Sequence, residues 1–187
     1  MWELLFAISW HAPDDCLPQL LEILLDLVPR LLPCHTCRLG YRVHLPTVNR
    51  RAHGKPKNPA HAFRWLYYLK DEVNRSFTPP VISITLQQLY TRYAIHDGHV
   101  LNDVEVADLL VLVAIEAKSL GREKDYRRFC VLISDLLPVA SDSILPSLVC
   151  AVMENVTTHA LHVTNSVRAY RCLPIRTLKH FRDWGDA

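Results

Sequence analysis

Apolar residues recur at helical intervals along most of this chain, and that spacing limits the folds it can adopt more than any other feature. Leucines and Val28 repeat every three or four residues between residues 17 and 28, and a similar stripe joins Phe63 to Phe77. The strict alternation of apolar and polar residues that marks a half-buried strand persists nowhere for more than a few residues. The sequence therefore predicts an all-α fold.

Capping and breaking residues divide this pattern into separate helices. Pro13-Asp14-Asp15 and Asn58-Pro59 are typical of helix starts, and Gly121 is typical of a helix end. With these boundaries we expect helices over residues 2–11, 14–32, 34–45, 59–77, 85–93, 102–120, 122–140, 141–163 and 178–184.

The connection at residues 46–58 is predicted to be a loop, and it is basic. It carries Arg50, Arg51, Lys55 and Lys57. Such a segment favours a solvated connector over the alternative, an anion-binding arm.

Two cysteines three positions apart, Cys34 and Cys37, stand where a helix is predicted to begin. A pair at this spacing forms either a redox couple or half of a metal site. The unpaired amide groups and the positive dipole end of a first turn lower the pKa of a thiol, so Cys34 or Cys37 is expected to be a thiolate near neutral pH. Because the thiolate is the species that attacks a disulfide, this position favours redox chemistry.

The other four cysteines are candidates for a second, shuttling thiol. Cys130 and Cys150 lie in apolar surroundings that favour buried, inert thiols. Cys172 is expected in a loop, and Cys16 lies near a helix start. The sequence does not choose among them.

Histidine pairs leave a metal site open as an alternative. His96-x-x-His99 and His159-x-x-His162 have the spacing of two ligands, and with the Cys34 pair they allow a zinc-binding interaction module. No second Cys-x-x-Cys occurs in the chain, and we therefore predict no metal site.

Composition argues against several classes of protein. Half of the 187 residues are hydrophobic, which is enough for a substantial core, and a net charge of only +2 argues against a dedicated nucleic-acid binder. The apolar residues 2–10 lack the basic leader of a secretory signal, and the longest apolar run, residues 107–115, is far shorter than the roughly 20 residues of a membrane span. We therefore expect a soluble protein without a secretory signal or transmembrane segment.

The order of short motifs in the first half of the chain is similar to that of a known enzyme family. These motifs are Trp2-Glu3-Leu4-Leu5, Pro13-Asp14, Pro33-Cys34-x-x-Cys37, Phe63-x-Trp65-Leu66-x-x-Leu69 and Glu72-Val73-Asn74-Arg75. Over about residues 1–93 the chain resembles the Erv/ALR family of FAD-linked sulfhydryl oxidases, most closely its compact viral members. The resemblance implies a four-helix bundle with a short fifth helix in residues 1–94, and commonly a homodimer. Residues 95–187 resemble no family, and we expect an additional helical domain there for docking or dimerisation.

The resemblance also implies roles for individual residues. Cys34 is the thiol that exchanges with an incoming dithiol, and Cys37 is the thiol that lies against the flavin. The implied contacts to FAD are Trp2, Phe6, Trp65, Lys70, Asp71, Val73, Asn74, Arg75 and Tyr90. Phe6 stands where the family usually has His, and Lys70-Asp71 stands where it usually has His-Asn. Phe6 can stack on adenine and Lys70 can pair with a pyrophosphate, whereas the Asp71 carboxylate repels phosphates.

Together, the dithiol and the resemblance predict an FAD-dependent thiol oxidase that forms disulfide bonds in other proteins. Reduced protein thiols are its expected substrates, O₂ its electron acceptor and H₂O₂ its product. A viral origin places it in the host cytoplasm or the virion. The alternative from another class is a flavin-free assembly or partner-binding protein of the same fold, in which the Cys34–Cys37 pair is structural. Neither nucleic acid nor membrane is expected among its partners.

Overall fold

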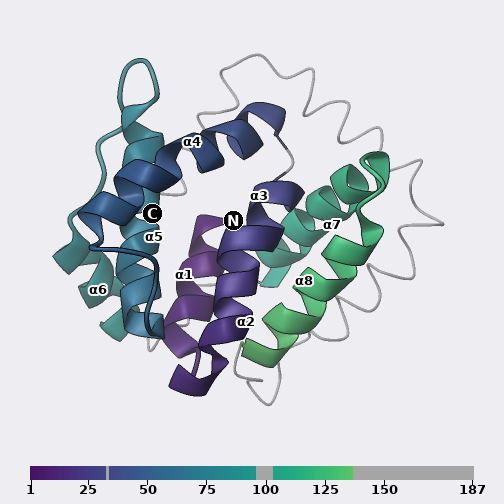
Figure 1. Cartoon of the computed structure of the whole chain (residues 1–187), viewed down its shortest axis with the longest axis horizontal. Helices are drawn as coiled ribbons and strands as arrows, with labels where there is room; N and C mark the ends of the chain where they lie inside the picture. Colours follow the sequence, from purple (N-terminus) through teal and green to yellow (C-terminus); the bar gives the residue numbers. More distant parts are fainter. Residues whose placement is uncertain (33, 96–102, 137–187) are drawn as a thin grey trace.

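The structure, a computed structural model, describes residues 1–32, 34–95 and 103–136 (Figure 1). Its helices are α1 (Trp2–His11), α2 (Leu17–Leu21), α3 (Val28–Leu31), α4 (His35–Arg51), α5 (Pro59–Arg75), α6 (Leu86–Ile95), α7 (Asp103–Ser119) and α8 (Glu123–Leu136). A 3₁₀ turn (Asp14–Cys16) precedes α2, and a π-helical segment (Glu22–Leu27) joins α2 to α3. No strand occurs in these ranges, which confirms the predicted all-α character. None of the described helices combines the length and the apolar character needed to cross a bilayer.

Helix α1 lies at the centre of the packing. Its residues 4–9 are all buried, as expected of a helix that is covered on every side. Helix α5 packs along it, and α8 contacts it as well; Figure 1 shows α1 between α5 and α2. The buried Ser9 hydroxyl donates to the Leu5 carbonyl oxygen at 2.9 Å, so this polar group is not left without a partner.

Residues 14–31 form one helical run whose winding changes in the middle. Pro29 has no N–H to donate to the preceding turn, so a carbonyl there needs another donor. The Tyr41 hydroxyl of α4 donates to the Leu24 carbonyl oxygen at 2.6 Å. Burial raises the pKa of Tyr41, which keeps the phenol neutral and able to donate. This bond ties α4 to the helical run that precedes it.

Helix α4 is longer than the sequence predicts. The prediction of a loop from residue 46 is wrong for residues 46–51, because Pro46 lies inside a helix that continues to Arg51. A proline in a helix interior costs about 3 kcal/mol, and contacts of the added turns with α5 offset that cost. The Trp65 indole N–H donates to Asn49 Oδ1 at 2.8 Å, and Arg51 pairs with Asp71 at 2.8 Å.

Aromatic rings join α1, α5 and α6. Phe63 of α5 lies at the centre of this cluster, with its ring centroid 5.0 Å from those of Phe6 and Tyr90. Tyr93 and Trp10 follow at 5.2 Å and 5.4 Å. Aromatic pairs at these separations stabilise beyond the area they bury, so the cluster holds the short α6 on the protein.

Helices α7 and α8 pack against the earlier helices and share their hydrophobic core. Gly121 ends α7 as predicted, with a φ of 64° that suits glycine. Across this contact Arg30 pairs with Asp125 at 3.3 Å, and Arg128 pairs with Glu22 at 2.8 Å. The helices predicted at residues 141–163 and 178–184 lie outside the described residues.

Candidate functional site

Cys34 and Cys37 lie at the start of α4, as predicted. Cys34 is the N-cap residue, with extended backbone angles (φ −107°, ψ 125°), and Cys37 belongs to the first turn. The Cys37 N–H donates to the Cys34 sulfur at 3.2 Å. The sulfur thus takes the place that a Ser or Asp oxygen usually has in an N-cap, and it satisfies one of the amide groups that a helix start leaves unpaired.

Both thiols are free and both residues are exposed, but the acidity of Cys37 is altered. Protein atoms around its sulfur desolvate the thiolate form, and the adjacent Cys34 thiol adds to this effect. Together they raise the pKa of Cys37 to about 12, although its backbone N–H and Arg38 act in the opposite direction. The prediction that the first turn lowers the thiol pKa is therefore wrong for Cys37, because desolvation outweighs the dipole.

Arg38 connects this first turn to the rest of the protein. Its guanidinium donates to the Leu32 carbonyl oxygen at 2.6 Å and pairs with Glu116 of α7 at 3.2 Å. The two paired side chains are only 12% and 11% exposed. Salt screens such a shielded pair less than a surface pair, so it can hold the start of α4 against α7 over a range of ionic strength.

One face of α4 leads away from the thiols and is open to solvent. Leu39 is 53% exposed, and Val43, one helical turn further on, is 72% exposed. Arg42 and Pro46 are exposed on the same face, and α4 contains no acidic residue. A molecule that approaches Cys34 along this helix meets an apolar and basic surface.

The aromatic residues predicted to contact FAD are packed within the protein. Phe6 and Trp65 have no exposed surface. Phe6 packs on Phe63, and the Trp65 indole is bonded to a side chain of α4. Tyr90 also stacks on Phe63, and Trp2 lies partly buried against the core.

Asp71, the predicted contact that is least compatible with a phosphate, takes part in an internal ion-pair network. Its carboxylate pairs with Arg51 at 2.8 Å and with Arg75 at 3.0 Å. Arg51 also pairs with Glu72 and lies over the Tyr68 ring, 4.8 Å from its centroid. The network fixes the end of α4 on α5. Arg51 and Arg75, which could otherwise bind a cofactor phosphate, are already paired with Asp71.

Trp65, one of the predicted cofactor contacts, lies beside a part of α4 that is far from the thiols. Three others, Lys70, Val73 and Asn74, lie half-buried on α5. Trp65 bonds to Asn49, which is twelve residues along α4 from Cys37, a rise of about 18 Å. As placed, the Trp65 indole is committed to Asn49 and the Asp71 carboxylate to Arg51 and Arg75, so these two side chains do not fit the predicted FAD contacts. FAD binding stays a prediction.

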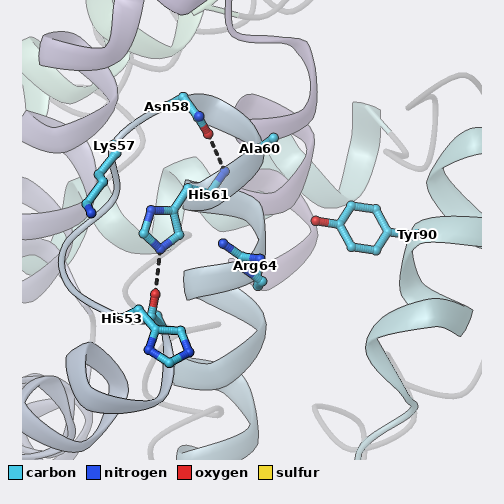
Figure 2. A pocket seen from close by; sticks show the side chains of 8 residues that line it. His53, Lys57, Asn58, Ala60, His61, Arg64 and Tyr90 are labelled. Carbon is cyan, nitrogen blue, oxygen red and sulfur yellow. Dashed lines mark hydrogen bonds between the residues drawn. The ribbon is translucent and has the colours of Figure 1, made fainter.

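The structure contains a cavity that the sequence did not reveal. Its volume is about 400 Å³, and it lies where the α4–α5 connection meets α5 and α6 (Figure 2). Its lining residues are Ala52, His53, Lys57, Asn58, Ala60, His61, Arg64 and Tyr90. Tyr90 is the one predicted cofactor contact among them. In the sequence, the cavity is indicated only by the basic segment that directly precedes the Asn58-Pro59 helix start. That signal does not reveal that Tyr90 of α6 also lines the cavity.

The other candidate sites lie only partly within the described residues. Cys16 is a free thiol, and Cys130 is buried as its apolar surroundings predict. The remaining candidates, Cys150, Cys172 and the histidine pairs at 96–99 and 159–162, lie outside the described residues. Within residues 1–32, 34–95 and 103–136, no three His, Cys, Asp or Glu side chains are grouped closely enough to hold a metal ion.

No protein-family model, no curated protein and no solved structure matches this chain.

Proposed function

We propose that this protein carries out thiol–disulfide exchange, with Cys34 and Cys37 alternating between a dithiol and a disulfide. The observation that carries the proposal is the pair itself: two free, exposed thiols at the start of one helix, with the Cys37 N–H 3.2 Å from the Cys34 sulfur. Residues three apart in a helical turn are neighbours at a separation from which a disulfide can form. Their exposure lets an external thiol reach the pair.

In the oxidising direction, a substrate thiolate attacks the Cys34 sulfur of the Cys34–Cys37 disulfide. The S–S bond breaks, a mixed disulfide forms on Cys34, and Cys37 leaves as a thiolate. It then takes up a proton, because its pKa of about 12 is far above neutral pH. The second substrate thiol attacks the mixed disulfide and releases Cys34. The substrate has lost two electrons and two protons, and the pair has gained them.

The raised pKa of Cys37 has a kinetic consequence. A thiol that holds its proton firmly is a poor leaving group, so we expect the first attack on Cys34 to limit the rate. The dithiol must afterwards be oxidised by a two-electron acceptor. An external disulfide such as oxidised glutathione can do this by the same exchange chemistry.

The rate at which the protein oxidises a peptide dithiol in the presence of oxidised glutathione tests the exchange proposal. We expect turnover with the native chain and with Cys16→Ser, a control that removes a free thiol elsewhere. Cys34→Ser and Cys37→Ser should abolish it. Equal rates for the native chain and the Cys34→Ser variant would reject the proposal.

We further propose, from the resemblance of residues 1–93, that the exchange centre belongs to an FAD-dependent oxidase of the Erv/ALR type. The order of α1, the run 14–31, α4 and α5, followed by the short α6, supports the four-helix bundle with a fifth helix that this family implies. A homodimer and a viral setting belong to the same proposal. The engaged side chains of the predicted FAD contacts speak against the flavin.

The oxidase proposal has its own experiment. Bound flavin gives the purified protein a visible absorption band, and an oxidase consumes O₂ when dithiothreitol is supplied. Both Cys34→Ala and Cys37→Ala should stop that consumption. A colourless protein that still exchanges thiols would reject FAD while leaving the exchange proposal intact.

A further inference from the structure

The cavity between the α4–α5 connection and α6 has basic lining residues and no acidic one. Lys57 and Arg64 are cations at neutral pH, and neither forms a salt bridge within the part of the chain that the structure describes. Arg51 and Arg75, by contrast, are both paired with Asp71. Positive charge is therefore left uncompensated at this hollow.

Backbone geometry adds a donor to the same hollow. Ala60 lines it from the first turn of α5, where the helix dipole is positive. The Asn58 side chain accepts the His61 N–H at 2.7 Å, and the Asn58 carbonyl oxygen accepts the Ala62 N–H at 2.9 Å. Pro59 has no N–H, so the amide of Ala60 is the group in this turn that an external acceptor can use.

Two rings on the rim are held in place by the fold. The Tyr90 ring stacks on Phe63, with an interplanar angle of 27°, and Figure 2 shows its hydroxyl directed toward Arg64. Burial raises the pKa of Tyr90, so the hydroxyl keeps its proton at neutral pH and can donate it. The His61 ring is fixed by a 2.8 Å hydrogen bond between its Nε2 and the Ala52 carbonyl oxygen. The Tyr90 hydroxyl is thus held in position before any ligand arrives, whereas the His61 Nε2 is already used by Ala52.

We propose that this cavity binds the phosphate group of a small phosphorylated molecule. A phosphate carries more charge and more acceptor oxygens than a carboxylate, which suits two cations together with a hydroxyl and a helix-start amide. The volume of about 400 Å³ lies in the range of small-ligand sites and leaves space for an organic group beside the phosphate. About 25 Å of helix α4 separates the site from Cys34, so the proposal does not depend on the exchange chemistry.

Isothermal titration calorimetry with inorganic phosphate and with adenosine monophosphate, at constant ionic strength, tests the site. We expect both probes to bind the native chain, and Arg64→Gln and Lys57→Gln each to weaken binding by about tenfold. Arg42→Gln removes an exposed arginine from α4 outside the cavity and should leave the affinity within about twofold. Circular dichroism of each variant checks that the fold is retained, which we expect because all three side chains are exposed.

Three results would overturn the proposal. One is the absence of binding by either probe. Another is an equal loss of affinity in Arg42→Gln and Arg64→Gln, which would indicate non-specific attraction to a basic surface. The third is binding to anionic lipid vesicles without binding to either soluble probe, which would indicate a membrane-facing charge patch. A smaller loss in Tyr90→Phe, which keeps the ring and removes the hydroxyl, would support the proposed geometry.

Discussion

At its C-terminal end, helix α4 is held to α5 by the hydrogen bond from Trp65 to Asn49 and by the ion pair of Arg51 with Asp71. At its N-terminal end, Cys34 and Cys37 are exposed residues with free thiols. Both ends carry residue types that are common in functional sites. At one end their hydrogen-bonding capacity and charge are used inside the protein, and at the other end they are open to an external molecule.

This difference shows that a residue of a type common in functional sites is not always available to a ligand. An arginine or tryptophan in a motif suggests a ligand contact, but a buried partner within reach satisfies it first, since an unpaired buried polar group is costly. Within the described ranges, the hydrogen bond at the thiols comes from their own turn, where the Cys37 N–H donates to the Cys34 sulfur. Variants that change one end of α4 at a time test whether the N-terminal end serves exchange and the C-terminal end serves stability.

The largest effect is expected from Cys34→Ser. Thiol–disulfide exchange should fall by about a thousandfold or more, because the attacked sulfur is removed. Serine is a good N-cap, so the free energy of unfolding should change by less than about 0.5 kcal/mol. Acid-quenched time courses measure the exchange rate, and urea unfolding measures the free energy of unfolding. A variant that keeps a tenth of the native rate would contradict the role of Cys34.

At the opposite end, Asp71→Asn should act on stability alone. Arg51 and Arg75 lose their shared carboxylate, and the free energy of unfolding should fall by about 2–3 kcal/mol. The matched control is Glu22→Gln in the exposed pair with Arg128, which should cost at most about 1 kcal/mol. Denaturant unfolding checks both variants. If Asp71→Asn left the stability unchanged and strongly reduced the exchange rate, the C-terminal end of α4 would have the functional role that we assign to the N-terminal end.

The raised pKa of Cys37 gives a pH-dependent prediction. A raised pKa means that the reactive thiolate is scarce at neutral pH and grows as the pH rises. In Cys34→Ser, where desolvation of Cys37 remains, alkylation of Cys37 at about pH 8 should be at least about tenfold slower than in an unfolded peptide. The rate, followed by mass spectrometry of the peptide that contains Cys37, should still be rising at about pH 10. A plateau near pH 8 would show an ordinary thiol.

The smallest of these effects is expected from Glu116→Gln. Arg38 keeps its bond to the Leu32 carbonyl oxygen but loses its charged partner, so unfolding should become easier by about 1 kcal/mol. If the pair positions the first turn of α4, the exchange rate should also change a few-fold. Asp125→Asn, in the more exposed pair with Arg30, is the control and should leave exchange unchanged. Equal exchange rates for both variants would reject a positioning role for the Arg38–Glu116 pair.

Much of the fold could be predicted from local signals, and the exceptions depend on distant contacts. The starts of α4 and α5 follow from the cysteine pair and from Asn58-Pro59, because caps act within one turn. The continuation of α4 through Pro46 depends on side chains of α5, which the local sequence does not contain. Each wrong prediction here is one in which tertiary contacts outweigh a local preference.

The same distinction applies to the sites. The spacing of Cys34 and Cys37 gave their position on the helix, but the raised pKa of Cys37 depends on atoms packed around its sulfur. The basic cavity needs Tyr90, which lies more than thirty residues beyond the α4–α5 connection. No periodicity or motif brings these groups together, so only a folded structure can show them.

The most direct test of the central claim is a glutathione redox titration that follows the peptide containing Cys34 and Cys37 by mass spectrometry. Exchange at this pair predicts that oxidised glutathione converts the dithiol to an internal disulfide, that the peptide loses the mass of two hydrogens, and that dithiothreitol reverses the change. A pair that stays reduced throughout, or that stops as a glutathione adduct without closing, would contradict it.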